Sequence, residues 1–489
     1  MNRSKKAAII IMLTVTAAVC IALLFNVQIY ASYAVWKTPR VEIKKEKLVG
    51  LRGNIYDRNG VLLAGTDENG RRYYPDNTAV HVIGALNSSG EAQSGTELLL
   101  DEQLSGTDGE IILEYTALKG EVFLSDKKII PAKNGCDVYL TIDSRLQKTA
   151  EEILKSAIEN HESSGRYGDY APPSASGGAI VAADPSSGEI LAMASAPDYS
   201  LESYSQDYDK IISGGNYPLL NRASQGLYRP GSTFKTITAF AALSEGAITP
   251  RTYFFCGEEF ELEGTLFSCM SQHRFVTVKK ALEVSCNIFF YKTALRLGTD
   301  ALVRYGEMFG FGSAPDLELD TADGQLASPQ VFADAGERWS DSQLVQAAIG
   351  QSKTECTPLQ MAVQAEIIAN RGTGYSPRII SHIINSSGEL VYSSDRKTAQ
   401  SIPDRSGAFD AVIDGMKAST VYTYGEYALS VLPENTAINT GTPQSPRGFD
   451  SAVIGFYPAE KPRIAFAVML EDGANAKNSV RTLIESFLS

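Results

Sequence analysis

The hydrophobic pattern begins with 19 almost entirely apolar residues, Ala7–Phe25, inside a segment, residues 7–36, that carries no charged side chain. About 20 helical residues, rising 1.5 Å each, cross the ~30 Å hydrocarbon core of a bilayer. Basic side chains among the first six residues favour a cytoplasmic tail and an exported remainder. We therefore predict an uncleaved membrane anchor. A cleaved signal peptide is the alternative, although its apolar core usually has only ~7–15 residues.

Beyond this stretch, the spacing of apolar positions predicts an α+β protein. Residues 136–142 (CDVYLTI) alternate as a half-buried strand does. Asp143 can cap a following helix, in which apolar residues recur at helical spacing from Leu146 to Ile158. Further strands are predicted at 178–183, 189–194, 435–442, 451–456 and 463–470, and helices at 232–245, 277–297 and 355–370. Strands on both sides of a helical block favour an α+β domain with an antiparallel sheet.

The distribution of turn residues and charges suggests how the chain is divided. Residues 37–49 are highly charged and are interpreted as a linker, and residues 160–177 form a polar loop rich in Gly, Ser and Pro. From Leu51 to about Lys133, frequent turns separate short apolar runs, which indicates a small α+β module. We predict a tail and single transmembrane helix at 1–36, a linker and small module at 37–140, and a large domain at 141–489.

Composition excludes several classes of function. The formal net charge of −13 argues against broad binding to nucleic acid. Six cysteines in 489 residues do not form a disulfide scaffold. With four histidines and no HExxH or CxxC motif, zinc chemistry is not expected. Cys256 and Cys269 could pair outside the membrane or remain as two free thiols.

The sequence Pro230-Gly231-Ser232-Thr233-Phe234-Lys235 carries the first candidate chemistry. Ser232 opens a predicted helix, and Lys235, three residues later, shares its face. A lysine held beside a serine in a closed site can lose its proton and activate the hydroxyl group. Free N–H groups at the helix start can stabilise an oxyanion. Two other Ser-x-x-Lys spacings lie in polar surroundings and are interpreted as solvated surface.

Two further motifs follow in a fixed order. Ser285-Cys286-Asn287 is the only Ser-x-Asn in the chain, and Asn439-Thr440-Gly441-Thr442 begins the last group of predicted strands. With Ser232 and Lys235, these motifs resemble the SxxK, SxN and KTG signature of the penicillin-recognising serine enzymes.

The resemblance extends along most of the chain. Residues 52–60 (RGNIYDRNG) resemble the segment that opens the pedestal module of class B penicillin-binding proteins. Other similar segments are 140–147 (LTIDSRLQ), 221–223 (NRA), 228–235 (YRPGSTFK), 350–351 (GQ) and 357–362 (TPLQMA). Soluble β-lactamases share the catalytic motifs but lack the pedestal. The resemblance implies a membrane helix, a small α+β pedestal and a transpeptidase domain with an antiparallel sheet flanked by helices.

The resemblance also implies a mechanism. Ser232 would attack the penultimate D-Ala carbonyl of a peptidoglycan stem peptide, and Lys235 would be the base. Ser285 would relay a proton to the leaving amine, and Asn287 would bind the substrate amide.

Other roles carry over to the third motif and to the partners of the protein. Thr440 would bind the substrate carboxylate, and the N–H groups of Ser232 and Thr442 would form the oxyanion hole beside Gly441. The expected ligands are stem peptides ending in D-Ala-D-Ala and β-lactams, without a metal or organic cofactor. A SEDS-family glycosyltransferase in the membrane would be the partner of this single-pass membrane protein.

One residue departs from the family pattern. The third motif normally begins with a cation, and here that position is Asn439. Charge-assisted hydrogen bonds contribute about 1.5–3 kcal/mol against ~1 for neutral ones, which predicts acylation slower by roughly one or two powers of ten. A catalytically silent scaffold in a wall-synthesis complex is the alternative. A β-lactam hydrolase or sensor is a third hypothesis, for which the motifs offer no deacylating base.

Overall fold

The computed structural model describes residues 2–37, 39–118, 121–159, 175–404, 406–424, 435–472 and 475–489. Contacts divide the chain into two units. The first comprises Met1–Arg52, Glu68–Gly70 and Ser105–Gly135, and the second comprises Gly53–Asp67, Arg71–Leu104 and Cys136–Ser489. The domain boundaries predicted from the sequence stay predictions, and most of the predicted loop at 160–177 lies outside the described residues.

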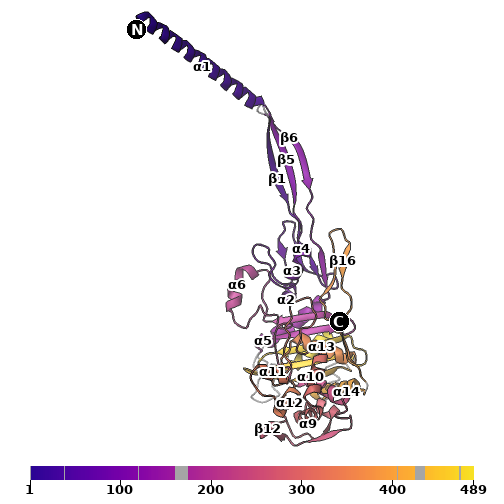
Figure 1. Ribbon diagram of the computed structural model, residues 1–489. Coiled ribbons are helices and arrows are strands. Elements are labelled where there is room, and N and C mark those ends of the chain that lie inside the picture. Colours follow the sequence, from indigo (N-terminus) through magenta and orange to yellow (C-terminus); the bar gives the residue numbers. More distant parts are fainter. Residues whose placement is uncertain are drawn as a thin grey trace. The chain divides into compact units, whose positions relative to one another are not determined.

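The first unit contains a long helix and a three-stranded sheet. Helix α1 (Arg3–Lys37) includes the apolar stretch, and its length and composition fit a membrane span. Strand β1 (Arg40–Leu48) pairs antiparallel with β5 (Gly109–Leu118), which pairs with β6 (Glu121–Ile130), as Figure 1 shows. Most of the segment interpreted as a charged linker, residues 37–49, thus forms a paired strand. The strand is stabilised by a partner more than 60 residues away in the sequence. A local pattern of residues could not reveal this pairing.

Most of the RGNIYDRNG segment lies in the second unit, where it connects an inner strand of a six-stranded sheet to a helix. The sheet has the order β16 (Leu390–Ser393), β15 (Ile380–Ile384), β7 (Asp137–Leu140), β2 (Ile55–Tyr56), β3 (Leu62–Thr66) and β4 (Arg72–Tyr73). Asp57, fully buried, accepts hydrogen bonds from the N–H groups of Asn59 (2.7 Å) and Val61 (2.8 Å) and from the Ser144 hydroxyl (2.7 Å). A side chain at Gly53 would overlap the carbonyl oxygen of Cys136. The motif is thus a tight turn fixed to the start of helix α5.

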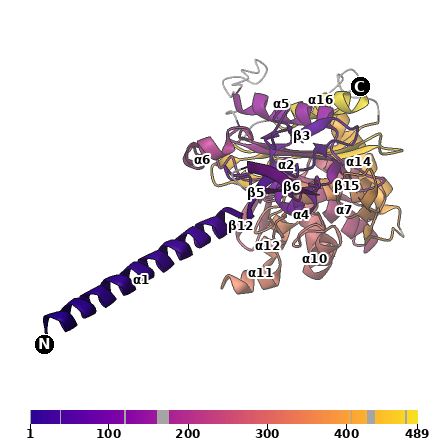
Figure 2. The same cartoon turned by 90° about the horizontal axis from the view of Figure 1, so that it is seen from above.

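A five-stranded antiparallel sheet forms the centre of the second unit. Its order is β18 (Ala437–Gly441), β21 (Ser451–Tyr457), β22 (Ile464–Leu470), β8 (Gly178–Asp184) and β9 (Glu189–Ala196). Helices α5 (Ser144–Glu159) and α16 (Lys477–Leu488) lie side by side (Figure 2) and pack their apolar residues on one face. Helix α13 (Pro358–Ala369), with all 12 residues buried, packs against β22 and β8. The predicted α+β fold is confirmed.

The two predicted helices that carry catalytic motifs are both interrupted. The segment at 232–245 begins as a 3₁₀ turn, η1 (Gly231–Phe234), before α7 (Lys235–Ser244). The segment at 277–297 is divided into α8 (Val278–Glu283) and α9 (Asn287–Leu297).

The remaining helices within the described residues are α2 (Val80–Ile83), α3 (Gly95–Leu99), α4 (Asp101–Leu104), α6 (Tyr204–Ser213), α10 (Thr299–Met308), α11 (Pro329–Asp334), α12 (Asp341–Ala347) and α14 (Ala408–Tyr424). Short strands complete the unit: β10 (Tyr253–Cys256), β11 (Glu259–Leu262), β12 (Thr265–Ser268), β13 (Arg274–Thr277), β14 (Thr373–Tyr375), β17 (Thr398–Ser401), β19 (Gln444–Ser445) and β20 (Gly448–Phe449).

Candidate active site

Ser232 lies in the tight turn η1, half-buried and directly before α7. Gly231 has a φ of +56°, which favours glycine, and its N–H group donates to the carbonyl of Gly350 at 2.9 Å. A side chain at Gly350 would overlap the carbonyl oxygen of Gly231. The Thr233 hydroxyl closes the turn by donating to the Pro230 carbonyl at 2.8 Å. The position of the serine thus depends on two glycines 119 residues apart in the sequence.

Lys235 joins the first motif to the second. Its side chain is fully buried, and Nζ donates to Oγ of Ser285 (3.0 Å), to the Ser285 carbonyl (2.8 Å) and to Oδ1 of Asn287 (2.7 Å). Burial lowers the pKa of Lys235 from 10.5 to about 8, because a charged ammonium group loses its solvation. About a tenth of the amine is therefore neutral at pH 7, far more than for a solvated lysine, and the neutral amine is the form that a general base requires.

The break between α8 and α9 presents the second motif. Ser285 has a φ of +53°, Cys286 is the N-cap residue of α9, and Asn287 begins that helix. Through this turn, the side chains of Ser285 and Asn287 both meet the same amine. The Asn287 amide nitrogen donates to the carbonyl of Ser268 at 3.2 Å, which fixes the orientation of the amide group.

The third motif runs along the edge strand β18 beside the nucleophile turn. A Cβ atom at Gly441 would lie 3.0 Å from the Pro230 carbonyl oxygen and 3.4 Å from the Ser232 nitrogen, so glycine permits this close approach. Thr440 is half-buried and Thr442 is exposed. Asn439 is only 2% exposed, and its Oδ1 has no hydrogen-bond partner among the described residues. The structure thus places a neutral, buried amide where the family signature has a cation.

The sequence analysis missed a cation close to this motif. Arg229 lies three residues before Ser232, and its guanidinium donates to the carbonyl of Gln444 at 3.4 Å, just beyond the third motif. An arginine directly before the Pro230-Gly231 turn was the available signal.

Gln364, on α13, is a second residue that the motifs did not reveal. Its amide nitrogen donates to the Thr233 carbonyl (2.9 Å) and to the Thr236 hydroxyl (2.8 Å). This buried polar contact holds the nucleophile turn against α13. Gln364 lies on the same helix as most of the TPLQMA segment, two residues after its end.

Four side chains next to the second motif could hold a metal ion. One potential ligand atom from each of Cys256, Cys269, His273 and Cys286 lies within 4.8 Å of all the others. The His273 Nδ1 atom is 3.6 Å from the Cys256 sulfur and 3.4 Å from that of Cys269. The close contact between the Cys269 and Cys286 thiols lowers the pKa of Cys269, which favours its thiolate form. Three sulfurs and one imidazole are a ligand set of structural zinc sites.

This cluster decides one interpretation of the sequence and bears on another. Cys256 and Cys269 are free thiols and do not form the disulfide that was one of the alternatives. The four potential ligands come from separate elements at spacings of 13, 4 and 13 residues and include no CxxC pair, so no local motif reveals them.

With the site described, comparisons with known proteins identify the class. The family described as penicillin binding protein transpeptidase domain matches residues 178–485. The chain therefore belongs to the penicillin-binding transpeptidase family, which confirms the resemblance found in the motifs. The roles predicted for the eight residues of the three motifs stay predictions.

Among the named relatives, Peptidoglycan D,D-transpeptidase MrdA of Escherichia coli is 28% identical over 89% of this chain and 73% of its own length. The MrdA of Acinetobacter baumannii is 27% identical over 84% of this chain, which spans 64% of that relative. Stage V sporulation protein D of Bacillus subtilis is 30% identical over 66% of this chain and 46% of that protein.

Solved structures agree with this family. The crystal structure of Pseudomonas aeruginosa PBP2 has a TM-score of 0.73 with 27% identity and covers 91% of this chain and 97% of that one. A chain of a peptidoglycan synthase complex has a TM-score of 0.78 with 24% identity over 99% of this chain and 98% of its own. The second likeness shows the fold alone.

Proposed function

We propose that this protein is a membrane-anchored peptidoglycan D,D-transpeptidase that forms an acyl-enzyme through Ser232. The observation that carries the proposal is the burial of Lys235 between the side chains of Ser285 and Asn287, with its pKa lowered to about 8. The names of the E. coli and A. baumannii relatives support the same reaction.

The proposed reaction begins when neutral Lys235 takes the proton of the Ser232 hydroxyl. The Ser232 oxygen attacks the carbonyl carbon of the penultimate D-Ala, and the N–H groups of Ser232 and Thr442 stabilise the oxyanion. As the C–N bond breaks, the proton passes from Lys235 through Ser285 to the leaving D-Ala amine. An amine of a neighbouring strand then attacks the ester carbonyl, and one of its protons returns through Ser285 and Lys235 to the Ser232 oxygen. The C–O bond breaks, which restores the Ser232 hydroxyl and leaves the new amide as the cross-link.

Substrate binding falls to the third motif and its surroundings. We assign the substrate carboxylate to Thr440, and we place the guanidinium of Arg229 close enough to replace part of the charge that Asn439 lacks. A single arginine at the rim is weaker than a buried lysine, because the surrounding water screens its charge. The proposed enzyme therefore acylates more slowly than one with a lysine at position 439.

The cellular setting is also a proposal. Helix α1 anchors the protein with a cytoplasmic tail and an exported catalytic unit, in accordance with the basic residues before the span. By its resemblance to class B penicillin-binding proteins, the protein would work with a SEDS-family glycosyltransferase.

The experiment is the intact mass of the full chain in detergent after incubation with benzylpenicillin. We expect a single penicilloyl adduct in the wild type, none in Ser232→Ala, and labelling about tenfold faster in Asn439→Lys. No adduct in the wild type over hours would reject the enzyme and favour the scaffold, which the unpartnered Asn439 makes the second candidate. Rescue by Asn439→Lys would then show that one residue silences the site.

A further inference from the structure

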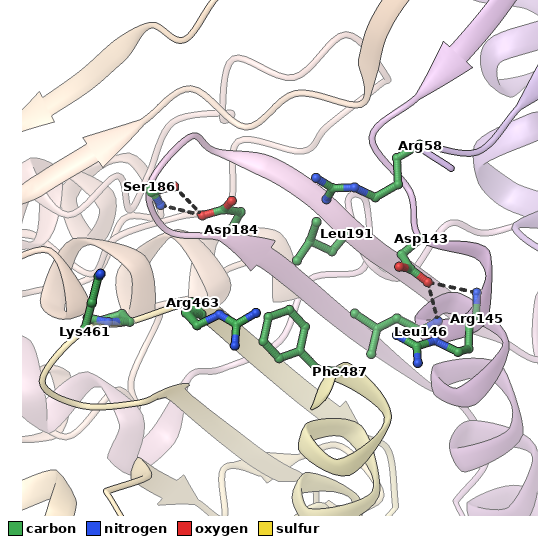
Figure 3. A pocket seen from close by; sticks show the side chains of 11 residues that line it. Arg58, Asp143, Arg145, Leu146, Asp184, Ser186, Leu191, Lys461, Arg463 and Phe487 are labelled. Carbon is green, nitrogen blue, oxygen red and sulfur yellow. Dashed lines mark hydrogen bonds between the residues drawn. The ribbon is translucent and has the colours of Figure 1, made fainter. Parts of the chain in front are cut away.

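A cavity lies at one end of the five-stranded sheet and shares no lining residue with the catalytic motifs. It has a volume of about 430 Å³ and is formed by the β8–β9 turn, the β21–β22 turn, the start of α5 and the end of α16. Figure 3 shows its lining side chains. A cavity of this size is within the range that takes a small ligand.

Four cations from separate parts of the sequence surround this cavity: Arg58, Arg145, Lys461 and Arg463. Two carboxylates also line it. The carboxylate of Asp143 accepts hydrogen bonds from two N–H groups at the start of α5, and that of Asp184 accepts from Ser186 in its own turn. The lining therefore keeps an excess of positive charge, although the chain as a whole has a net charge of −13.

The ion pairs leave this excess uncompensated. Arg58 contacts Glu189 at 3.2 Å, but the same carboxylate binds Arg378 at 2.8 Å. Within the described ranges, Lys461 and Arg463 form no ion pair. Some exposed cations elsewhere in the unit, such as Lys148, Lys210 and Arg481, do have carboxylate partners. Lys461 and Arg463 therefore bring unpaired positive charge to the cavity.

One of these cations is held by an aromatic ring. The Arg463 guanidinium lies over the Phe487 ring, 5.3 Å from its centroid, and Figure 3 shows the two side chains next to each other. Stacking of this kind covers the flat face of a guanidinium and leaves its N–H edges free. Those edges match the oxygen pairs of phosphoryl groups, which they bind in a bidentate manner.

We propose that this cavity binds a phosphoryl group, free as inorganic phosphate or carried by a lipid headgroup. Phosphate fits the positive charge better than a single carboxylate, because it carries up to two negative charges and offers oxygens toward several cations at once. The apolar side chains of Leu191 and Phe487 in the same lining would contact the ligand's apolar part when it has one.

The test is a calorimetric titration of the full chain in neutral detergent with inorganic phosphate, with dihexanoyl phosphatidic acid and with acetate. The variant is the double substitution Lys461→Gln and Arg463→Gln. Arg481→Gln on α16 is the matched control, because Arg481 is exposed and paired outside the cavity.

We expect both phosphoryl probes to bind, and the double variant to weaken them at least about tenfold while the control leaves them unchanged. Equal affinity of the two probes would identify a site for the free anion, and tighter binding of the lipid would identify the headgroup. Absence of binding by either probe, equal binding of acetate, or equal binding by the double variant would overturn the proposal.

Discussion

The Nζ atom of Lys235 lies 3.0 Å from Oγ of Ser285, a residue 50 positions further along the chain. This contact connects the nucleophile turn to the second motif inside a buried space. Lys235, three residues after Ser232, begins α7 directly behind the nucleophile turn. In the proposed mechanism, the reactivity of this group of residues depends on the protonation of Lys235.

The rate of acylation should therefore depend on pH. The pKa of Lys235 is about 8, below its usual value of 10.5, so the neutral amine increases as pH rises from 6 and predominates above about 8. We expect the rate constant for acylation by benzylpenicillin to rise over this range and then level off. A time course of the intact mass at each pH measures it. A rate that falls between pH 6 and 8 would contradict the role of Lys235 as the base.

Gly350→Ala should disturb the nucleophile turn. The new methyl group would overlap the Gly231 carbonyl, whereas Gly336, with a similar φ of +70°, has no atom within 4 Å of the added carbon. Both variants carry the ~1–2 kcal/mol cost of a left-handed alanine, but only Gly350→Ala moves Ser232. We expect acylation to slow at least about tenfold in Gly350→Ala and to stay unchanged in Gly336→Ala. Equal rates in the two variants would refute this coupling.

The cysteine and histidine cluster should bind zinc. We expect close to one zinc per chain by elemental analysis of the full protein, and loss of this metal in Cys256→Ser. Cys356→Ser is the matched control, because Cys356 is equally buried but lies outside the cluster. A chelator should lower the melting temperature of the wild type and leave that of Cys256→Ser unchanged. Metal retained by Cys256→Ser would exclude this site.

Glu366 should make the stability of the protein depend on pH. Burial raises the pKa of its carboxyl group from 4.5 to about 8, although the Tyr375 N–H donates to Oε1 at 2.8 Å. Because the folded protein holds the Glu366 proton more tightly than the unfolded chain does, the contribution of this carboxyl group to stability is complete below about pH 4.5. That contribution is lost as pH rises through about 8. Glu366→Gln should reduce the fall in melting temperature between pH 5 and 8. The exposed control Glu261→Gln should show the same fall as the wild type.

Periodicity was sufficient for elements that are stabilised locally. Helix α5 begins where Asp143 accepts hydrogen bonds from Arg145 and Leu146, as its capping position predicted. The order of the three motifs likewise predicted the candidate site through the resemblance. The helix cap is encoded within a few neighbouring residues, and the site is encoded in three short motifs that the family shares.

Features that depend on distant contacts could not be predicted. Strand β1 is stabilised by β5, and the break at Ser285 follows from packing that turns φ positive, so local spacing suggested a linker and one long helix. The metal-ligand cluster was missed for the same reason. Its ligands meet only after strand β10, the loop before β13 and the start of α9 have packed together.

The pairing of β1 has a mechanical consequence. From Arg40 to Leu48, nine consecutive residues are matched with β5, and a strand of this length extends about 30 Å. An unpaired segment of nine residues would behave as an elastic tether whose ends approach and separate with thermal motion. The ladder turns the same residues into a stiff spacer, so the two ends of β1 keep a constant separation when tension or compression acts along it.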